Sequence, residues 1–251
     1  MSSLFLSFAQ GQENLSKSFD RLLPMEYQVD GNRDFLDHWI EPYLNYGSVV
    51  YDVGGGKNPV VGLGAKRRLS LRLVGFDIDR DELAASPPGV YDETICGDIT
   101  QYRGGADADL VVCQALLEHV RDSPAAITAI ASILKPGGTA LIFLPSRNAV
   151  FARLNLLLPQ HLKRKILHSV FPSTIRDQGF PAFYDHCTPA DFRRLAAANG
   201  LAVDVCKVYF RSAYFTFFFP LHVAWRIWML IFRLFKGDQA AETFSLALRK
   251  I

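Results

Sequence analysis

The residues most suited to ligand binding are three consecutive glycines that follow an apolar segment. Residues 49–53 read Val-Val-Tyr-Asp-Val and run directly into Gly54, Gly55 and Gly56. Because glycine has no Cβ, its backbone can approach a bound molecule more closely than that of other residues. Further apolar segments end beside a small or acidic residue, as in Gly75-Phe76-Asp77. This repeated pattern predicts an open α/β sheet with a nucleotide-like ligand bound at the carboxyl edge of its strands.

The order of apolar segments predicts a Rossmann-like α/β fold, with a seven-stranded, mostly parallel sheet and helices on both faces. The expected strands are residues 48–53, 73–76, 93–96, 110–113, 139–144, 201–210 and 242–248. Asp79 opens a capping box, and Ser123-Pro124 and Thr188-Pro189 mark two further helix starts. Residues 33–44 have helical apolar spacing, whereas the glycines and proline of residues 57–71 predict a short or irregular crossover helix.

The length and the 49% hydrophobic content predict one domain over residues 1–251. Residues 1–46 form a lead-in and helix, and residues 47–145 form the ligand-binding core. Apolar and basic helical insertions are expected at 146–190, before the sixth strand, and at 211–240, between the sixth and seventh. These insertions would form a cap or a membrane-facing surface.

The cysteine spacing and the amino terminus favour a cytoplasmic protein. None of the cysteines has C-x-x-C spacing, so we expect free thiols in a reducing compartment. The first eight residues carry no positive charge before their short apolar run and do not qualify as a secretory signal. The four cysteines are Cys96, Cys113, Cys187 and Cys206.

Four signals, in the same order along residues 49–144, resemble the class I S-adenosylmethionine-dependent methyltransferases. They are Asp52-Val-Gly-Gly-Gly56, Gly75-Phe-Asp77, Gly97-Asp98 and Leu134-Lys-Pro-Gly-Gly138. One glycine cluster alone would be weak evidence, whereas the ordered set strongly favours this fold. The resemblance is to the small-molecule type, similar to methyltransferase domain 11. It implies S-adenosyl-L-methionine as the cofactor.

The resemblance also implies a role for the glycine loop. The backbone of Gly54, Gly55 and Gly56 would approach the amino-acid portion and ribose of the cofactor. Asp52 would help to hold the ammonium group through charge-assisted hydrogen bonds. The alternative is that the glycines form an ordinary tight turn.

Further cofactor contacts follow from the later matched positions. Asp77 would accept hydrogen bonds from the ribose hydroxyls, because an acidic residue about twenty positions after a nucleotide-binding glycine loop performs this task. Asp98 would accept a hydrogen bond from the adenine amino group, with Ile99 packed beside the ring; a solvated loop aspartate is the alternative. Gln114 follows the fourth strand, where the family places backbone near the sulfonium and methyl. The fourth strand ends in Cys113-Gln114, where the family has an acidic or aromatic motif. The sequence therefore does not identify the substrate.

Two histidines are candidates for proton transfer. Residues 116–120 read Leu-Leu-Glu-His-Val and resemble the Glu-His-Val segment of small-molecule methyltransferases, including ubiquinone-biosynthesis O-methyltransferases. His119 is therefore the first candidate for a general base, with Glu118 beside it, because the ordinary pKa of histidine is near 6.5. His186, in Tyr-Asp-His, is the second candidate. The alternatives are that Glu118 and His119 anchor the loop and that Tyr184-Asp185-His186 is a capping and packing cluster. His119 and Glu118 are also possible metal ligands, but no further residues have the spacing of a ligand set.

Charge divides the chain unevenly. Residues 1–150 hold 13 Lys and Arg against 19 Asp and Glu, a net of −6, whereas residues 151–251 hold 14 against 6, a net of +8. The carboxyl-terminal part therefore faces an anionic partner or balances the acidic part. Within it, residues 154–170 combine leucines with basic residues and contain no acidic residue.

Residues 213–235 are apolar enough to suggest a membrane span, but Arg226 within them disfavours one. On a helix, His222, Arg226 and Arg233 form one narrow cationic stripe among aromatic and aliphatic residues. Such a helix is predicted to lie in the plane of an anionic membrane surface. Alternatively, this segment and residues 154–170 cap the substrate pocket or form the seam of a homodimer.

These observations favour a cytoplasmic methyltransferase (EC 2.1.1.-) that is peripheral on the inner face of the membrane. Its acceptor would be an oxygen on a small hydrophobic or lipid-linked molecule, such as a quinone precursor, isoprenoid conjugate or glycolipid. One alternative is a non-catalytic cofactor-binding or scaffold protein. Another is an rRNA or protein methyltransferase, which the lack of a dedicated recognition domain disfavours. Nucleic acid is an unfavoured partner, because the basic residues are interleaved with aliphatic bulk.

Overall fold

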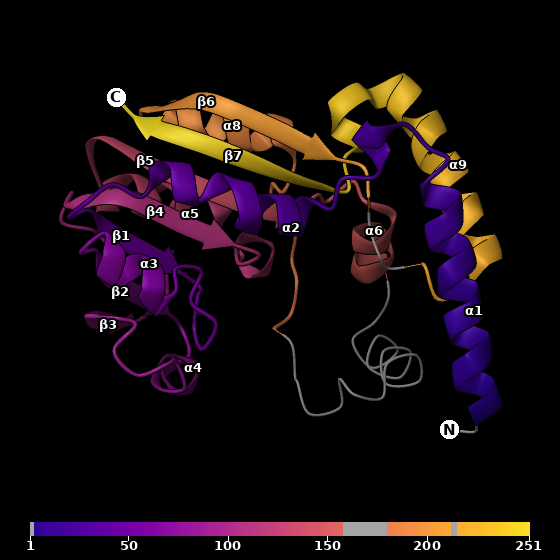
Figure 1. The fold of residues 1–251 in the computed structure, drawn as a ribbon. Coiled ribbons are helices and arrows are strands. Elements are labelled where there is room, and N and C mark those ends of the chain that lie inside the picture. The colour runs from indigo at the N-terminus through magenta and orange to yellow at the C-terminus, as the bar shows by residue number, and fades with distance from the viewer. Residues whose placement is uncertain (1–2, 158–179, 212–214) are drawn as a thin grey trace.

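The computed structural model describes residues 3–157, 180–211 and 215–251. Their strands form one seven-stranded sheet in the order β3-β2-β1-β4-β5-β7-β6 (Figure 1). β7 runs antiparallel to β5 and β6, and the other pairs are parallel. The predicted fold class is thereby confirmed. The strands are β1 Val49–Val53, β2 Arg72–Asp77, β3 Glu93–Cys96, β4 Ala108–Gln114, β5 Leu134–Pro145, β6 Leu201–Tyr209 and β7 Thr243–Lys250.

The helices begin and end close to the predicted positions, with three differences, the first of which is that the expected lead-in contains α1, an α-helix of 18 residues. They are α1 Ser3–Asp20, α2 Gly31–Asp34, α3 Leu63–Arg68, α4 Arg80–Ala84, α5 Ser123–Ile133, α6 Val150–Leu157, α8 Pro189–Ala198 and α9 Phe219–Lys236. Asp79 and Thr188 cap α4 and α8 as predicted, but the cap of α5 is Asp122 rather than Ser123. The predicted helix 33–44 is broken into α2, a π-helical turn and a 3-10 turn that contains Pro42, which has no N–H to continue an α-helix.

Alternate residues of the central strands face two different layers. Tyr51 and Val53 of β1 belong to the same buried apolar cluster as α5, whereas Val50 belongs to the cluster of Phe35 and Val61 on the opposite face. Because side chains alternate across a strand, the apolar run of β1 is buried on both faces. The parallel strands are thus the rigid core that positions the loops at their carboxyl ends.

The strand order reverses at β1, which pairs with β2 on one side and with β4 on the other. Ligands of open α/β sheets bind outside the carboxyl ends of the strands at such a point. The Gly54 N–H donates to the carbonyl oxygen of Phe76 at 2.7 Å, and the Ala115 N–H donates to that of Phe143 at 2.8 Å. These bonds fix the start of the two loops between which a site can form.

Helices α1 and α9 pack against each other beside the sheet (Figure 1). His222 and Arg226 of α9 are fully buried and both contact Asp20 at the end of α1, at 2.9 Å and 2.7 Å. Arg233 forms an ion pair with Glu26. The predicted stripe of His222, Arg226 and Arg233 therefore faces the protein and not an anionic surface, because carboxylates distant in sequence pair with it.

The solvent face of α9 is instead apolar. Trp228 is 54% exposed and Leu234 and Phe235 are 85% and 80% exposed. None of the helices within the described ranges is long and apolar enough to cross a membrane. Of the predicted basic segment 154–170, residues 158–170 lie outside the described part of the chain. All four cysteines are free thiols.

Candidate functional site

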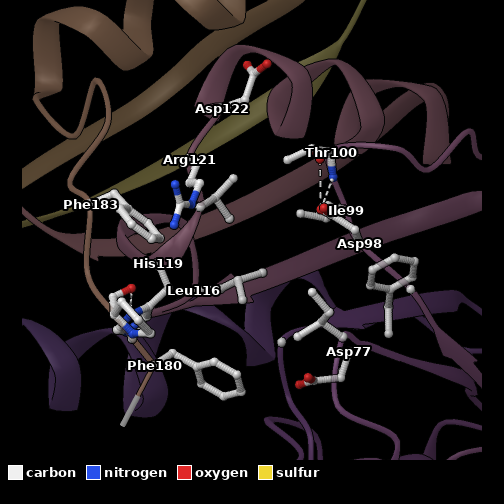
Figure 2. Close-up of a pocket in the computed structure, with 17 residues that line it drawn as sticks. Asp77, Asp98, Ile99, Thr100, Leu116, His119, Arg121, Asp122, Phe180 and Phe183 are labelled. Atoms are coloured by element: carbon white, nitrogen blue, oxygen red, sulfur yellow. Dashed lines mark hydrogen bonds between the residues drawn. The ribbon is translucent and has the colours of Figure 1, made fainter.

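A cavity of about 530 Å³ opens at the carboxyl edge of the sheet, where the loops after β1, β2, β3 and β4 meet (Figure 2). Asp77 and Asp98 lie on one side of it, and His119, Arg121 and Phe183 lie on the other. The cavity therefore joins one acidic end to one end with a cation and aromatic rings. The remaining lining residues are Gly54, Phe76, Ile78, Gly97, Ile99, Thr100, Ala115, Leu116, Val120, Asp122, Phe180 and Pro181.

Gly54 is the member of the glycine loop that lines the cavity. Its φ is +85°, a conformation that residues with a side chain rarely adopt, and a Cβ there would lie 3.0 Å from the Leu116 side chain. Across the cavity floor, Ala115 has a φ of +49° at the end of β4. A non-glycine residue with positive φ is uncommon and concentrates at functional sites. Both turns therefore keep backbone at the cavity surface.

Asp52 does not reach the cavity. Its side chain is buried, and Oδ2 accepts hydrogen bonds from the Val60 N–H at 2.9 Å and from the Tyr91 hydroxyl at 3.0 Å. Burial raises the pKa of Asp52 to about 6. A Cβ on Gly55 would overlap this carboxyl group, so Gly55 leaves space for Asp52 rather than for a ligand. Asp52 fastens the loop and does not line the cavity, whereas its expected role was to hold the ammonium group of the cofactor.

Asp77 has the features expected of a ribose-binding carboxylate. Oδ1 accepts the Asp79 N–H at 2.9 Å, and none of the ion pairs among the described residues includes Asp77. Burial raises its pKa, as do the nearby charges of Asp79 and Glu82. Gly56, outside the cavity lining, leaves room here because a Cβ would lie 3.2 Å from Asp77 Oδ2. A half-buried carboxylate without a cation suits neutral donors such as hydroxyls.

Asp98 and Ile99 form the next part of the same wall. Asp98 Oδ1 accepts hydrogen bonds from the N–H and the hydroxyl of Thr100, both at 2.9 Å, which hold the carboxylate at the exposed rim. Ile99 is buried behind it and lines the cavity. With Asp77 and Gly54, these residues fit the ribose and adenine of the expected cofactor. Asp77 and Asp98 offer acceptors for the hydroxyl and amino groups, and Ile99 offers an apolar surface for the ring.

His119 contributes an imidazole at the opposite end. Its Nδ1 lies 3.1 Å from the Pro181 carbonyl oxygen, and since a carbonyl only accepts, Nδ1 carries the hydrogen. Nε2 therefore keeps its lone pair and lies 3.8 Å from Glu118 Oε1. Burial lowers the pKa of His119, which the carbonyls of Pro181 and Phe180 partly offset. The ring is therefore neutral near pH 7 and can accept a proton.

Glu118 lies beneath the cavity and does not line it. Burial raises its pKa to about 8, so it is protonated near pH 7. Its Oε2 has no hydrogen-bond partner within the described ranges. Its backbone carbonyl accepts from the N–H groups of Phe183 and Tyr184 at 2.7 Å and 3.0 Å. Glu118 thus holds the aromatic segment against the cavity and acts as a positioning residue.

His186 and Gln114 also lie outside the cavity lining. His186 Nδ1 lies 2.8 Å from Asp185 Oδ1, and the other Asp185 oxygen accepts the Ser123 N–H at 2.9 Å. This cluster anchors the start of α5, in agreement with the alternative role given to it. Gln114 donates to Asn32 Oδ1 at 2.6 Å and ties β4 to α2.

The sequence prediction missed several residues of the cavity, of which three bear on the acceptor end. Phe180 and Phe183 form its aromatic wall, and the Arg121 guanidinium lies 4.4 Å from the centroid of the Phe183 ring. The aromatic residues just before Tyr184 were the available signal, because that segment was already expected beside the acceptor. Arg121 directly follows the Glu-His-Val segment. No group of three potential metal ligands occurs among residues with a described position.

Comparison with known proteins agrees with this fold. The sequence profile of the methyltransferase domain family matches residues 25–204. The ubiquinone biosynthesis O-methyltransferase of Aeromonas salmonicida is 23% identical over 176 residues, which cover 66% of this chain and 68% of that protein.

Two solved structures have a similar fold. One is an S-adenosylmethionine-dependent methyltransferase from Mesorhizobium loti, with a TM-score of 0.56 at 14% identity. The alignment covers 89% of this chain and 100% of that protein. The other is phosphoethanolamine N-methyltransferase 2 of Haemonchus contortus, solved with S-adenosyl-L-methionine, with a TM-score of 0.54 at 14% identity. The alignment covers 95% of this chain and 57% of that protein.

Proposed function

The chain belongs to the methyltransferase domain family and is an S-adenosylmethionine-dependent methyltransferase, and from this premise we propose that it methylates an oxygen of a small hydrophobic or lipid-linked acceptor. Quinone precursors, isoprenoid conjugates and glycolipids are acceptors of this kind. The observation that carries the proposal is the imidazole of His119, which lines the end of the cavity opposite Asp77 and Asp98 and whose Nδ1 is held by the Pro181 carbonyl.

The acidic end of the cavity would hold the cofactor. Asp77 would accept hydrogen bonds from the ribose hydroxyls, Asp98 from the adenine amino group, and Ile99 would pack against the ring. When bound, S-adenosyl-L-methionine supplies an activated methyl group on a sulfonium. The protein's contribution is then to align the acceptor and to exclude water, because the leaving group comes with the cofactor.

The opposite end would orient the acceptor. His119 would take the proton of the acceptor hydroxyl at Nε2, while the Pro181 carbonyl holds Nδ1–H and fixes the ring orientation. Phe180, Phe183 and Leu116 make this end apolar, which supports a hydrophobic acceptor. The similarity to a ubiquinone biosynthesis O-methyltransferase also supports transfer to oxygen.

We further propose that the enzyme acts on the inner surface of an anionic membrane. The apolar face of α9, with Trp228, Leu234 and Phe235 exposed, would enter the interface between headgroups and acyl chains. The net charge of +8 over residues 151–251 includes Arg226 and Arg233, which pair with carboxylates; the other basic residues of this part would complement anionic lipids. The Asp20–Arg226 pair supports this orientation, because it keeps the charges of α9 on the protein side.

Two substitutions test the proposed base. His119→Gln should lower methyl transfer to catechol and quinol acceptors by about 10²- to 10⁴-fold and leave binding of S-adenosylhomocysteine, measured by calorimetry, unchanged. His186→Gln is the matched control, because its ring lies near but outside the cavity lining. Equal rates for wild type and His119→Gln, or a larger loss with His186→Gln, would contradict the assignment.

Vesicle flotation tests the membrane proposal. Wild-type protein should float with phosphatidylglycerol vesicles, and Trp228→Glu with Leu234→Glu should abolish flotation. Tyr46→Glu, an exposed residue before β1, is the control and should float as wild type does. Failure of the wild type to float would contradict membrane action and leave the enzymatic proposal intact.

A further inference from the structure

We propose that Arg121 is a binding site for an oxyanion, a carboxylate or phosphate, carried by the methyl acceptor. This inference rests on the proposed function, because it concerns the acceptor end of the same cavity. The acceptor class would then be an apolar body with a hydroxyl group toward His119 and an anionic group at Arg121.

Arg121 is a cation in the cavity without a carboxylate partner. Some arginines form ion pairs, such as Arg72 with Glu93 and Arg249 with Asp204, whereas others, such as Arg67, are in none of the ion pairs of the described residues. Arg121 is exposed like Arg67 but differs from it because it lines the cavity. None of the ion pairs of the described residues includes Arg121, although its side chain lines the cavity. A guanidinium offers five N–H donors that match the geometry of carboxylate and phosphate oxygens.

The neighbouring carboxylate forms no ion pair with this cation among the described residues. Asp122 is the N-cap of α5, and its Oδ1 accepts the Ala125 N–H at 2.9 Å. The helix therefore engages the negative group that lies next to Arg121 in sequence. The guanidinium is instead held over the Phe183 ring, at 4.4 Å from its centroid. Stacking on an aromatic face orients the planar group while leaving its edge donors available.

The charges of the cavity favour one direction of binding for an anionic acceptor. Asp77 and Asp98 at the far end repel an oxyanion, whereas Arg121 attracts it. Asp122, the third carboxylate of the lining, accepts the Ala125 N–H at the start of α5. His119 and Arg121 line the same end of the cavity. One acceptor could therefore place its hydroxyl at His119 and its anion at Arg121.

Binding of three related probes to protein saturated with S-adenosylhomocysteine tests the inference by calorimetry. The probes are 3,4-dihydroxybenzoate, 3,4-dihydroxyphenylphosphonate and the neutral 4-methylcatechol. Wild type should bind the two anions more tightly than the neutral probe. Arg121→Gln should weaken binding of the anions by about 10- to 100-fold and change binding of 4-methylcatechol by less than about 2-fold. Arg121→Lys should retain part of the preference.

The control is Arg67→Gln, which removes an exposed arginine of α3 outside the cavity and should bind all three probes as wild type does. A preference for the carboxylate over the phosphonate, or the reverse, would identify the anion. Binding of none of the probes, equal affinity for charged and neutral probes, or an equal loss for all three in Arg121→Gln would refute the inference. Turnover is measured separately: selective binding without methyl transfer would contradict the proposed function alone.

Discussion

Removal of the Asp20 carboxylate should undock α1 from α9. Arg226 is fully buried, and Asp20 Oδ1 accepts its Nε–H at 2.7 Å. Two further bonds, to the carbonyls of Phe210 at 2.6 Å and Tyr27 at 2.7 Å, would remain in Asp20→Ala. Breaking a buried pair costs about 3–5 kcal/mol because a buried charge loses its partner. Since two bonds survive, we expect a loss near the lower end, about 3 kcal/mol.

Urea unfolding and hydrogen exchange measure this loss. The amides of α1 and α9 should exchange faster in Asp20→Ala than in wild type. Glu13→Ala removes the exposed Glu13–Lys17 pair from the same helix and should cost at most about 0.5 kcal/mol. Adding Arg226→Met to Asp20→Ala should restore most of the stability, because an apolar replacement of a buried pair is often neutral or stabilising. A loss below 1 kcal/mol, or no restoration in the double variant, would refute this reasoning.

The same pair has a defined pH dependence. Burial alone would raise the pKa of Asp20, but the hydrogen bond from His222 and the charge of Arg226 lower it below its ordinary value of 3.8. A depressed carboxyl pKa stabilises the fold above the unfolded pKa, and this stabilisation is lost as the pH falls through the folded pKa. The difference in unfolding free energy between wild type and Asp20→Ala should therefore shrink below about pH 4.

Three further predictions concern the cavity. Gly54→Ala should destabilise the protein by about 1–2 kcal/mol in urea unfolding, because of its positive φ and its contact with Leu116; an unchanged midpoint would contradict this. Asp77→Asn should weaken S-adenosylhomocysteine binding by about 10-fold or more in calorimetry, whereas Asp79→Asn should not. Glu118 keeps its proton in the folded state up to about pH 8, so its contribution to the unfolding free energy should fall as the pH rises from about 4.5 to 8. The melting temperature of Glu118→Gln should therefore fall less than that of wild type between about pH 4.5 and 8. If the melting temperatures of the two proteins change in parallel with pH, the raised pKa of Glu118 is refuted.

The sheet could be predicted from sequence because its strands are defined by local patterns. β3 has the predicted bounds, 93–96, and the buried runs of β1 and β5 leave little choice of secondary structure. Asp79 and Thr188 cap their helices as expected, because a cap depends on residues within three positions. Ser123 failed as a cap since the acidic Asp122 before it competes for the same N–H groups.

The direction of polar side chains could not be predicted from local patterns. Asp52 turns away from the cavity because Tyr91, 39 residues later, donates to it. Arg226 turns inward because Asp20, 206 residues earlier, lies on that side of α9. Helical periodicity indicates that one face of α9 is polar, but it does not indicate which face meets the rest of the protein.

The position of β7 has a consequence for biosynthesis. Residues 243–250 are made last among the strands, yet they lie between β5 and β6 and bond to both. While the ribosome is still translating the α9 segment, the nascent chain exposes the open edge of β5, and β6 has no neighbour with which to pair. Unpaired edges of this kind invite aggregation, so chaperones that shield newly made chains should be most needed during the interval between synthesis of β5 and of β7.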